Sequence, residues 1–184
     1  MKKVILAAVA LISVVFAGTA HAQSKTDNVT VNIKLKPIHT LVVNAGQKIV
    51  DLVYTTEDDY NDGVASPVLA DHLKIFSTGA FEIQVKTGGN FESNPSGESI
   101  DASSVTVTPS AGTTKASTGA VYTEKTLSNS DQQIISNTAG GRDLTVNVKY
   151  AGAGADAYIN KFSKSRGVSE NVFTAQVTYT ILAL

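Results

Sequence analysis

The sequence predicts an all-β fold, an Ig-like antiparallel β-sandwich of about 8–10 strands. Three observations predict it: apolar and polar residues alternate with period two in one segment after another, Gly/Asn/Ser/Pro turns separate these segments, and Val and Thr are abundant. Several short strands between turn signals are typical of a sandwich or a barrel. One-sided alternation favours antiparallel sheets with a solvated outer face. We expect no helix in the mature part of the chain.

The expected strands follow from this alternation in chain order. They are residues 28–35, 38–43, 47–54, 71–77, 80–86, 105–107, 121–127, 132–136, 144–150 and 173–181. Thr78-Gly79 is expected to turn a hairpin between the fourth and fifth of these segments. Pro109 is expected to stop the short strand before it, because proline lacks a backbone donor. Residues 55–66 are expected to be an acidic loop.

The first residues predict an export signal. Lys2 and Lys3 precede the apolar run at 4–16, and Ala20-His21-Ala22 forms a small-residue cleavage box. The apolar run is too short to span a membrane, although a retained N-terminal anchor is the alternative. We therefore expect residues 1–22 to be a cleaved signal peptide and residues 23–184 to be a single domain. The protein is then exported to the periplasm, the cell surface (as a fimbrium) or the medium.

Composition bears on the class of function. The chain has no Cys, which excludes disulfides, thiol catalysis and thiolate metal sites. The formal net charge is −1, and no basic patch favours nucleic acid as a partner. His39 and His72 are the two histidines after the leader, and neither has a recognisable catalytic partner in the sequence, so we expect surface or edge histidines. The sequence thus predicts neither an enzyme nor a cofactor.

The sequence contains two candidate binding sites, one acidic and one aromatic. Asp58, Asp59 and Asp62 offer the oxygen ligands that Ca²⁺ prefers, but their spacing does not fit a known calcium loop, and a solvated acidic turn is the alternative. A second set of side chains is aromatic and suits a platform that stacks carbohydrate, with ordinary packing at strand ends as the alternative. It consists of Tyr54, Tyr60, Tyr122 and Tyr158.

Both ends of the mature chain carry alternating strands. The first contains Asn28-Val29-Thr30-Val31 and Leu35, followed by Pro37-Ile38 and Leu41, and the last ends close to the C-terminus. In these segments the chain resembles fimbrial major subunits of the colonisation-factor class of alternate chaperone–usher pilins, and also small secreted surface β-domains of bacteria. The resemblance to pilins implies a neighbouring copy and a periplasmic chaperone as partners.

The same resemblance implies that one subunit donates a strand to the next. The donated residues would be Val29, Val31, Ile33 and Leu35. The acceptor groove would lie along the final strand, through Phe173, Ala175, Val177 and Tyr179. In strand donation, main-chain hydrogen bonds give affinity and alternate side chains fill pockets. The alternative, slightly favoured by sequence alone, is an ordinary first strand paired within its own sheet.

Two functions follow from these observations. The first is an exported structural or adhesive surface protein, a pilin-like subunit or fibre component that assembles through β-strand pairing. The second is a monomeric secreted binding module for glycan, cell wall or host protein. The location of the strand that pairs with residues 29–35 distinguishes them.

Overall fold

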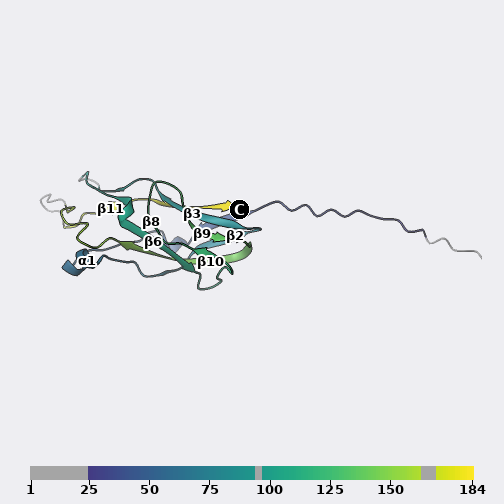
Figure 1. Cartoon of the computed structure of the whole chain (residues 1–184), viewed down its shortest axis with the longest axis horizontal. Coiled ribbons are helices and arrows are strands. Elements are labelled where there is room, and N and C mark those ends of the chain that lie inside the picture. The colour runs from purple at the N-terminus through teal and green to yellow at the C-terminus, as the bar shows by residue number, and fades with distance from the viewer. Residues whose placement is uncertain (1–24, 94–96, 163–168) are drawn as a thin grey trace, which may run out of the picture. The chain divides into compact units, whose positions relative to one another are not determined.

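The computed structural model describes residues 25–93, 97–162 and 169–184 (Figure 1). The chain divides into two units, Met1–Lys34 and Leu35–Leu184. The predicted signal peptide, residues 1–22, lies outside the described residues. Within the described ranges, no helix is both long and apolar enough to cross a membrane.

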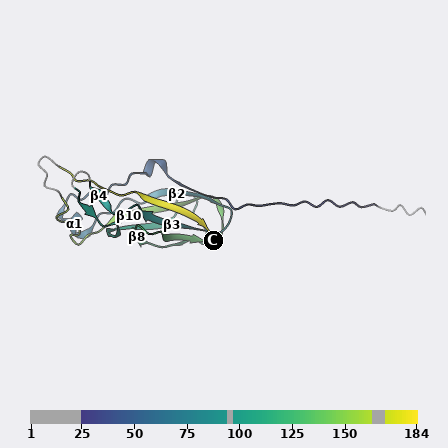
Figure 2. The same cartoon turned by 90° about the horizontal axis from the view of Figure 1, so that it is seen from above.

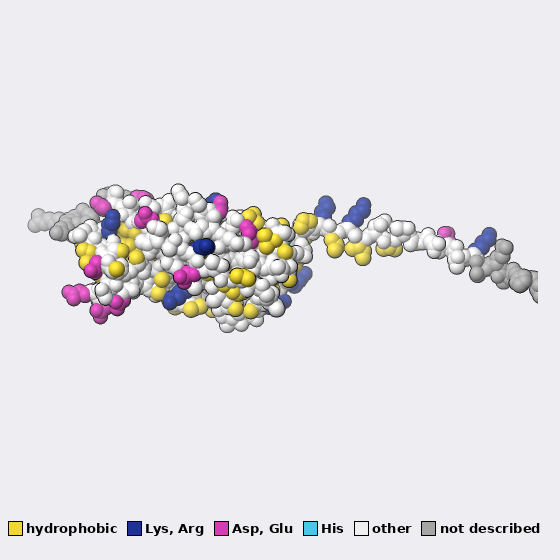
Figure 3. Space-filling view, viewed as in Figure 1, with side chains coloured by type: hydrophobic (Ala, Val, Ile, Leu, Met, Phe, Trp, Pro, Cys, Tyr) yellow, Lys and Arg dark blue, Asp and Glu magenta, His cyan; other side chains and the backbone are white. Residues whose placement is uncertain are grey.

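Residues 25–38 run as a drawn-out chain that forms no strand (Figure 1). Val29, Val31, Ile33 and Leu35 are 80–88% exposed. Alternate residues of an extended chain point to opposite sides. Figure 3 accordingly shows hydrophobic side chains along one side of this segment and basic side chains along the other. The prediction of an ordinary first strand at 28–35 is therefore wrong for this structure, whereas the alternating pattern is visible in three dimensions.

The second unit is an antiparallel β-sandwich, which confirms the predicted all-β fold. The five-stranded sheet has the order β1 (His39–Val43), β2 (Leu69–Ser77), β10 (Gly141–Gly152), β6 (Val105–Ala111), β8 (Lys125–Thr126). The four-stranded sheet has the order β12 (Val177–Ala183), β3 (Phe81–Thr87), β9 (Gln132–Asn137), β7 (Val121–Tyr122). A small sheet contains β11 (Phe173–Thr174), β4 (Phe91–Ser93) and β5 (Ser99–Ile100). Figure 2 shows the layers from a second direction.

The core is made by the inward faces of these strands. In β3, Phe81, Ile83 and Val85 are fully buried, while the residues between them are half-buried. Ile75 of β2 and Val146 of β10 are buried in the five-stranded sheet. Burial of each large apolar side chain stabilises the fold by about 1.5–3 kcal/mol. Because no disulfide is available, this packing and the ladder hydrogen bonds hold the unit together.

The predicted hairpin around Thr78-Gly79 is wrong. β2 and β3 belong to different sheets, so this connection crosses from one sheet to the other. The crossing places the apolar faces of β2 and β3 on opposite sides of the same core. Ser77 fixes the turn, since its Oγ donates to the carbonyl of Gly79 at 2.6 Å and accepts from the Gly79 amide at 3.3 Å.

Three other strand predictions need correction. Residues 47–54 form no strand, although Val50 and Leu52 pack on the core; the short 3-10 helix η1 (Ala45–Gln47) precedes them. The segment 121–127 splits into β7 and β8, which lie in different sheets. β6 continues through Pro109, which pairs with Val148 of β10. Proline is tolerated there because β8 pairs with β6 only at Thr106 and Val107, so no strand needs the missing donor.

The described residues also include helical turns that the sequence did not predict. One is α1 (Glu57–Asp62), and the other is the 3-10 helix η2 (Ala102–Ser104). Thr56 caps α1 by accepting from the Asp59 amide, and the Asp59 side chain accepts from the Thr56 amide in return. This capping box converts part of the expected acidic loop at 55–66 into a helix. In both Figure 1 and Figure 2, α1 lies at the end of the sandwich away from the C-terminal end of β12.

Candidate functional sites

One edge of each main sheet lies on the same side of the sandwich. β1 is the last strand of the five-stranded sheet and β12 is the last strand of the four-stranded sheet. Cα atoms of these two strands approach within 8 Å of each other. Both strands meet the connection between the sheets, where the Thr78 amide donates to Ile38 at 3.0 Å and the Leu184 amide donates to Ala80 at 3.1 Å. β1 leaves this connection and β12 reaches it, so the two edges run in opposite directions.

The structure places the four predicted acceptor residues in different settings. Val177 and Tyr179 lie on β12 and pack against the core. Phe173 lies on β11, which pairs with β4 in the small sheet. Ala175 lies between the two strands. The expected continuous strand 173–181 is thus interrupted, and the carbonyl of Gln176 at the break accepts from the Gly88 amide at 3.2 Å.

Beneath this edge lies a buried cluster of polar aromatic side chains. The hydroxyl groups of Tyr150 and Tyr179 are 2.5 Å apart and connect β10 to β12. His72 of β2 meets both rings edge-on, with centroid distances of 6.2 Å and 6.0 Å. Its Nδ1 is 3.0 Å from Oε1 of Gln47. Burial lowers the pKa of His72 and raises the pKa of both tyrosines.

One of the two histidines differs from the expectation of surface or edge residues. His72 is only 2% exposed, so that prediction is wrong for this residue. An aromatic cage and one amide partner compensate its burial. His39 is half-buried on β1, and its Nδ1 is 2.9 Å from Oγ of Ser77 on the neighbouring strand. The Ser77 hydroxyl is engaged in the turn, where it donates to the carbonyl of Gly79 at 2.6 Å, and among the bonds that the described residues make neither histidine is paired with a carboxylate.

A second candidate site is an open hollow beside α1 with a volume of about 500 Å³. Its apolar lining is Tyr60, Tyr158, Ile159 and Phe162. Its polar lining is Glu57, Asn61, Asp156 and Asn160. Ile159 and Phe162 are 50% and 48% exposed, which leaves apolar surface open to solvent. The hollow therefore combines aromatic surface with carboxylate and amide groups.

Three of the four predicted platform tyrosines come together at this hollow, where Tyr60 and Tyr158 line it and Tyr54 packs behind them. The ring of Tyr54 lies 5.4 Å from that of Tyr60 and 5.0 Å from that of Tyr158. The Tyr54 hydroxyl donates to the carbonyl of Ala153 at 2.9 Å, and burial raises its pKa to about 12. Tyr122 is not part of the group, because it lies on β7 in the four-stranded sheet.

Two chain segments distant in sequence are locked together to form the hollow. The amides of Ala155 and Asp156 donate to the carbonyls of Asn61 and Tyr60, at 2.6 Å and 2.9 Å. This approach requires glycine: a Cβ on Gly154 would lie 2.5 Å from the carbonyl oxygen of Asn61. The sequence shows the Gly/Ala tract but not its partner, since the partner lies about ninety residues earlier in the chain.

The lining residues Asp156 and Asn160 have left-handed backbones, with φ of 60° and 70°. Asn and Asp tolerate this region better than other non-glycine residues. The Ile159 amide donates to the carbonyl of Asp156 at 3.0 Å and tightens the turn. Residues held in sparsely populated conformations concentrate at functional sites. Sequence analysis did not identify Ile159 and Phe162 as site residues. What distinguishes them is their exposure to solvent, which only the structure shows.

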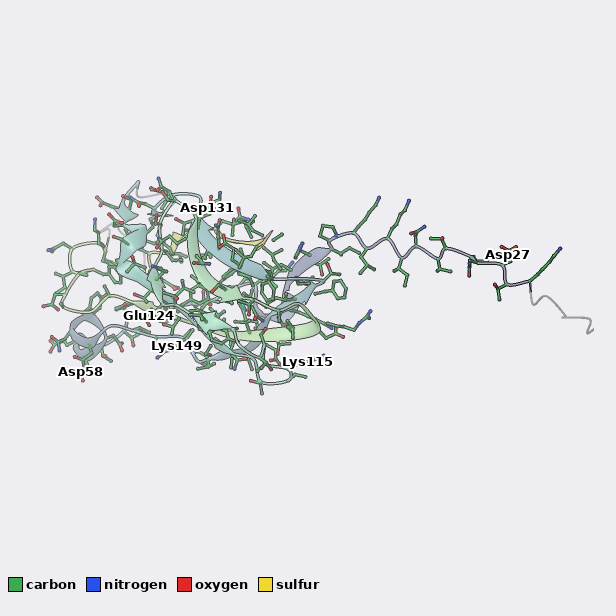
Figure 4. The ribbon with its side chains drawn as sticks, turned by 45° about the vertical axis from the view of Figure 1, so that its right-hand side comes forward. Asp27, Asp58, Lys115, Glu124, Asp131 and Lys149 are labelled. Carbon is green, nitrogen blue, oxygen red and sulfur yellow. The ribbon has the colours of Figure 1, made fainter. Side chains whose placement is uncertain are left out.

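The predicted calcium ligands do not converge. Asp59 Oδ2 accepts from the amides of Thr55 and Thr56, both at 2.8 Å, and these bonds lower its pKa to about 2. Asp58 and Asp62 are exposed on α1, and Figure 4 labels Asp58 on this helix. In the part of the chain that the structure describes, no group of three or more His, Cys, Asp or Glu is arranged to hold a metal ion. The capping role accounts for Asp59.

The chain was compared with known protein families and with curated proteins. No protein-family model matches the chain, and no curated protein matches its sequence.

Proposed function

We propose that the protein is an exported, non-catalytic structural subunit of a surface fibre, and that residues 29–35 of one copy pair with the β12 edge of the next. The observation that carries this proposal is the exposure of Val29, Val31, Ile33 and Leu35, which is 80–88%. Burying each of these side chains contributes about 1.5–3 kcal/mol. An alternating segment with one continuous apolar side has the pattern that strand addition uses.

The β12 edge supports the acceptor half of the proposal. A terminal strand of a sheet has backbone donors and acceptors for a further strand, and exposed edges are natural pairing sites. Val177, Tyr179 and Ile181 give this edge an apolar inward face. Of the acceptor residues that the sequence predicts, Val177 and Tyr179 belong to this edge, and Ile181 completes the proposed groove.

An inserted strand would require the β1 and β12 edges to separate. Neighbouring strands lie about 4.8 Å apart, so a strand inserted between two others holds them roughly 9.6 Å apart. Some Cα atoms of β1 and β12 are within 8 Å. In this proposal the β1 and β12 edges of the free subunit are in contact, which is a closed form. The edges must first separate and expose their apolar residues, and the donated strand then covers these residues. A periplasmic chaperone that stabilises the open form would speed this step without being required for it.

Truncation tests the proposal. A variant that begins at Pro37 should fold, because the second unit has its own core, and it should stay monomeric while the chain from Gln23 forms multimers. Size-exclusion chromatography with light scattering measures the mass, and circular dichroism checks the fold. A monomeric chain from Gln23, or a truncated variant that still forms multimers, would contradict strand donation.

A second candidate function is a monomeric exported binding module. The open aromatic hollow beside α1 supports this candidate. The hollow lies on a different part of the sandwich from the C-terminal end of β12, so binding there does not depend on strand pairing. The truncation experiment separates the two functions. A monomeric binding module should stay a folded monomer whether or not residues 29–35 are present.

A further inference from the structure

We infer that the hollow between α1 and residues 156–162 is a binding site for a neutral saccharide. Ligand sites combine apolar and aromatic walls with a few polar groups, in volumes of about 300–1,000 Å³. This hollow has a volume of about 500 Å³ and has both kinds of lining. The inference is independent of strand donation, because none of its residues lies at the β1 or β12 edge.

The aromatic residues give the hollow affinity for sugar rings. Aromatic faces carry negative charge density, and the C–H groups of a pyranose present a weakly positive surface to them. Tyr60, Tyr158 and Phe162 line the hollow, and Phe162 retains 48% exposure. Tyr158 is held in place through its hydroxyl, which is 2.9 Å from Oγ of Ser104. This hydrogen bond fixes the position of one of the three aromatic side chains that a sugar ring would meet.

The polar lining defines the class of saccharide. Glu57 and Asp156 supply carboxylates, and Asn61 and Asn160 supply amides, which together accept from and donate to hydroxyl groups. Of the described residues that line the hollow, none is Lys or Arg. A sialic acid or a sulfated sugar would place its anion against two carboxylates, and no described lining residue supplies a compensating cation. The lining thus favours hydroxyl-bearing neutral sugars over acidic ones.

Backbone hydrogen bonds tie the α1 side of the hollow to residues 155–156. The amides of Ala155 and Asp156 bind the carbonyls at the end of α1, and Gly154 permits the close approach. Tyr54 fills the space behind Tyr60 and Tyr158. A preformed site loses little conformational entropy on binding, which matters for a shallow site with few contacts.

Saturation-transfer NMR on the chain from Gln23 tests the inference, with lactose, chitotriose and sialyllactose each at about 5 mM, a concentration that populates sites with Kd near 1 mM. We expect transfer to the ring protons of lactose or chitotriose and weaker transfer to sialyllactose. Phe162→Ala should reduce the transfer and raise Kd about tenfold. Asp156→Asn, which tolerates the left-handed backbone, should weaken binding without changing the fold.

Ile49→Ala is the matched control, because Ile49 is 83% exposed and does not line the hollow. It should bind like the parent protein. Three outcomes would overturn the inference: no transfer to lactose or chitotriose, equal transfer in Phe162→Ala and the parent, or preference for sialyllactose. None of them depends on multimer formation, so failure here is distinguishable from failure of the strand-donation proposal.

Discussion

The hydroxyl groups of Tyr150 and Tyr179 lie 2.5 Å apart and link β10 of one main sheet to β12 of the other. Both rings are inside the sandwich, and His72 lies against both of them. This contact anchors the β12 edge to the opposite sheet. It is therefore the first place to perturb the proposed acceptor edge without altering its shape.

Tyr179→Phe should lower the free energy of unfolding by about 1–3 kcal/mol, because it leaves the buried hydroxyl of Tyr150 without its partner. The double variant Tyr150→Phe/Tyr179→Phe should recover part of that loss, since it removes both polar groups. Urea denaturation followed by circular dichroism measures both values. A double variant that loses the full sum of the two single losses would show that the hydroxyl groups are not coupled.

Asp71 should make the fold sensitive to acid. Its carboxylate accepts from the amides of Thr113 and Thr114 at 2.7 Å and 3.0 Å, and also from the Thr114 hydroxyl. These hydrogen bonds lower the pKa of Asp71 from 3.8 to about 2, and the bond from the Thr114 hydroxyl has the largest effect. Because folding lowers this pKa, its contribution is fully present above pH 3.8 and is lost as the pH falls towards 2.

The measurement for Asp71 is a difference between two proteins, because other carboxylates also have lowered pKa values. Asp71→Asn keeps the left-handed backbone, which has φ of 50° at this residue. At pH 7 the variant should be less stable than the parent, and the gap should narrow as the pH falls below 3.8. A gap that stays constant down to pH 2 would exclude this carboxylate as the source.

The period-two alternation was enough to predict the β class and most of the long strands. β3 has the inward and outward residues that its sequence indicated, and β10 extends the expected strand at both ends. Alternation does not reveal which sheet a strand joins. Thr78-Gly79 has the residues of a turn, but those residues do not show that the chain crosses between sheets there.

The parts of the candidate sites that residues close in sequence form could be predicted, whereas the parts that distant residues form could not. The capping box at Thr56 and Asp59 is a local pattern, but the acidic run around it is equally typical of a loop. The hollow depends on contacts between residues 60–61 and 154–156, which no local pattern contains. The burial of His72 likewise depends on Tyr150 and Tyr179 from later strands.

Gly154→Ala should disrupt the hollow. A Cβ at this position would lie 2.5 Å from the backbone oxygen of Asn61, and backbone atoms cannot move aside as a side chain can. We expect a stability loss of about 1–3 kcal/mol, the range for overpacked sites. Gly88→Ala is the control, because no atom lies within 4 Å of its added Cβ. Thermal melts compare the two variants, and equal midpoints would contradict the close packing.

Val31→Asp should abolish multimer formation and leave the subunit itself intact. Val31 is 80% exposed, so a charge there perturbs no core. In a donated strand the same side chain would enter an apolar groove, where an unpaired carboxylate is strongly unfavourable. Light scattering gives the mass of the multimer, and a thermal melt gives the stability of the subunit.

The neighbouring position provides the control for Val31→Asp. Thr30→Asp adds the same charge one residue earlier, on the opposite side of the extended segment. If the apolar side alone enters the groove, Thr30→Asp should still form multimers, since its charge stays in solvent. Equal loss of assembly in both variants would mean that charge, and not the face that carries it, controls association. Normal assembly of Val31→Asp would exclude the segment as the donated strand.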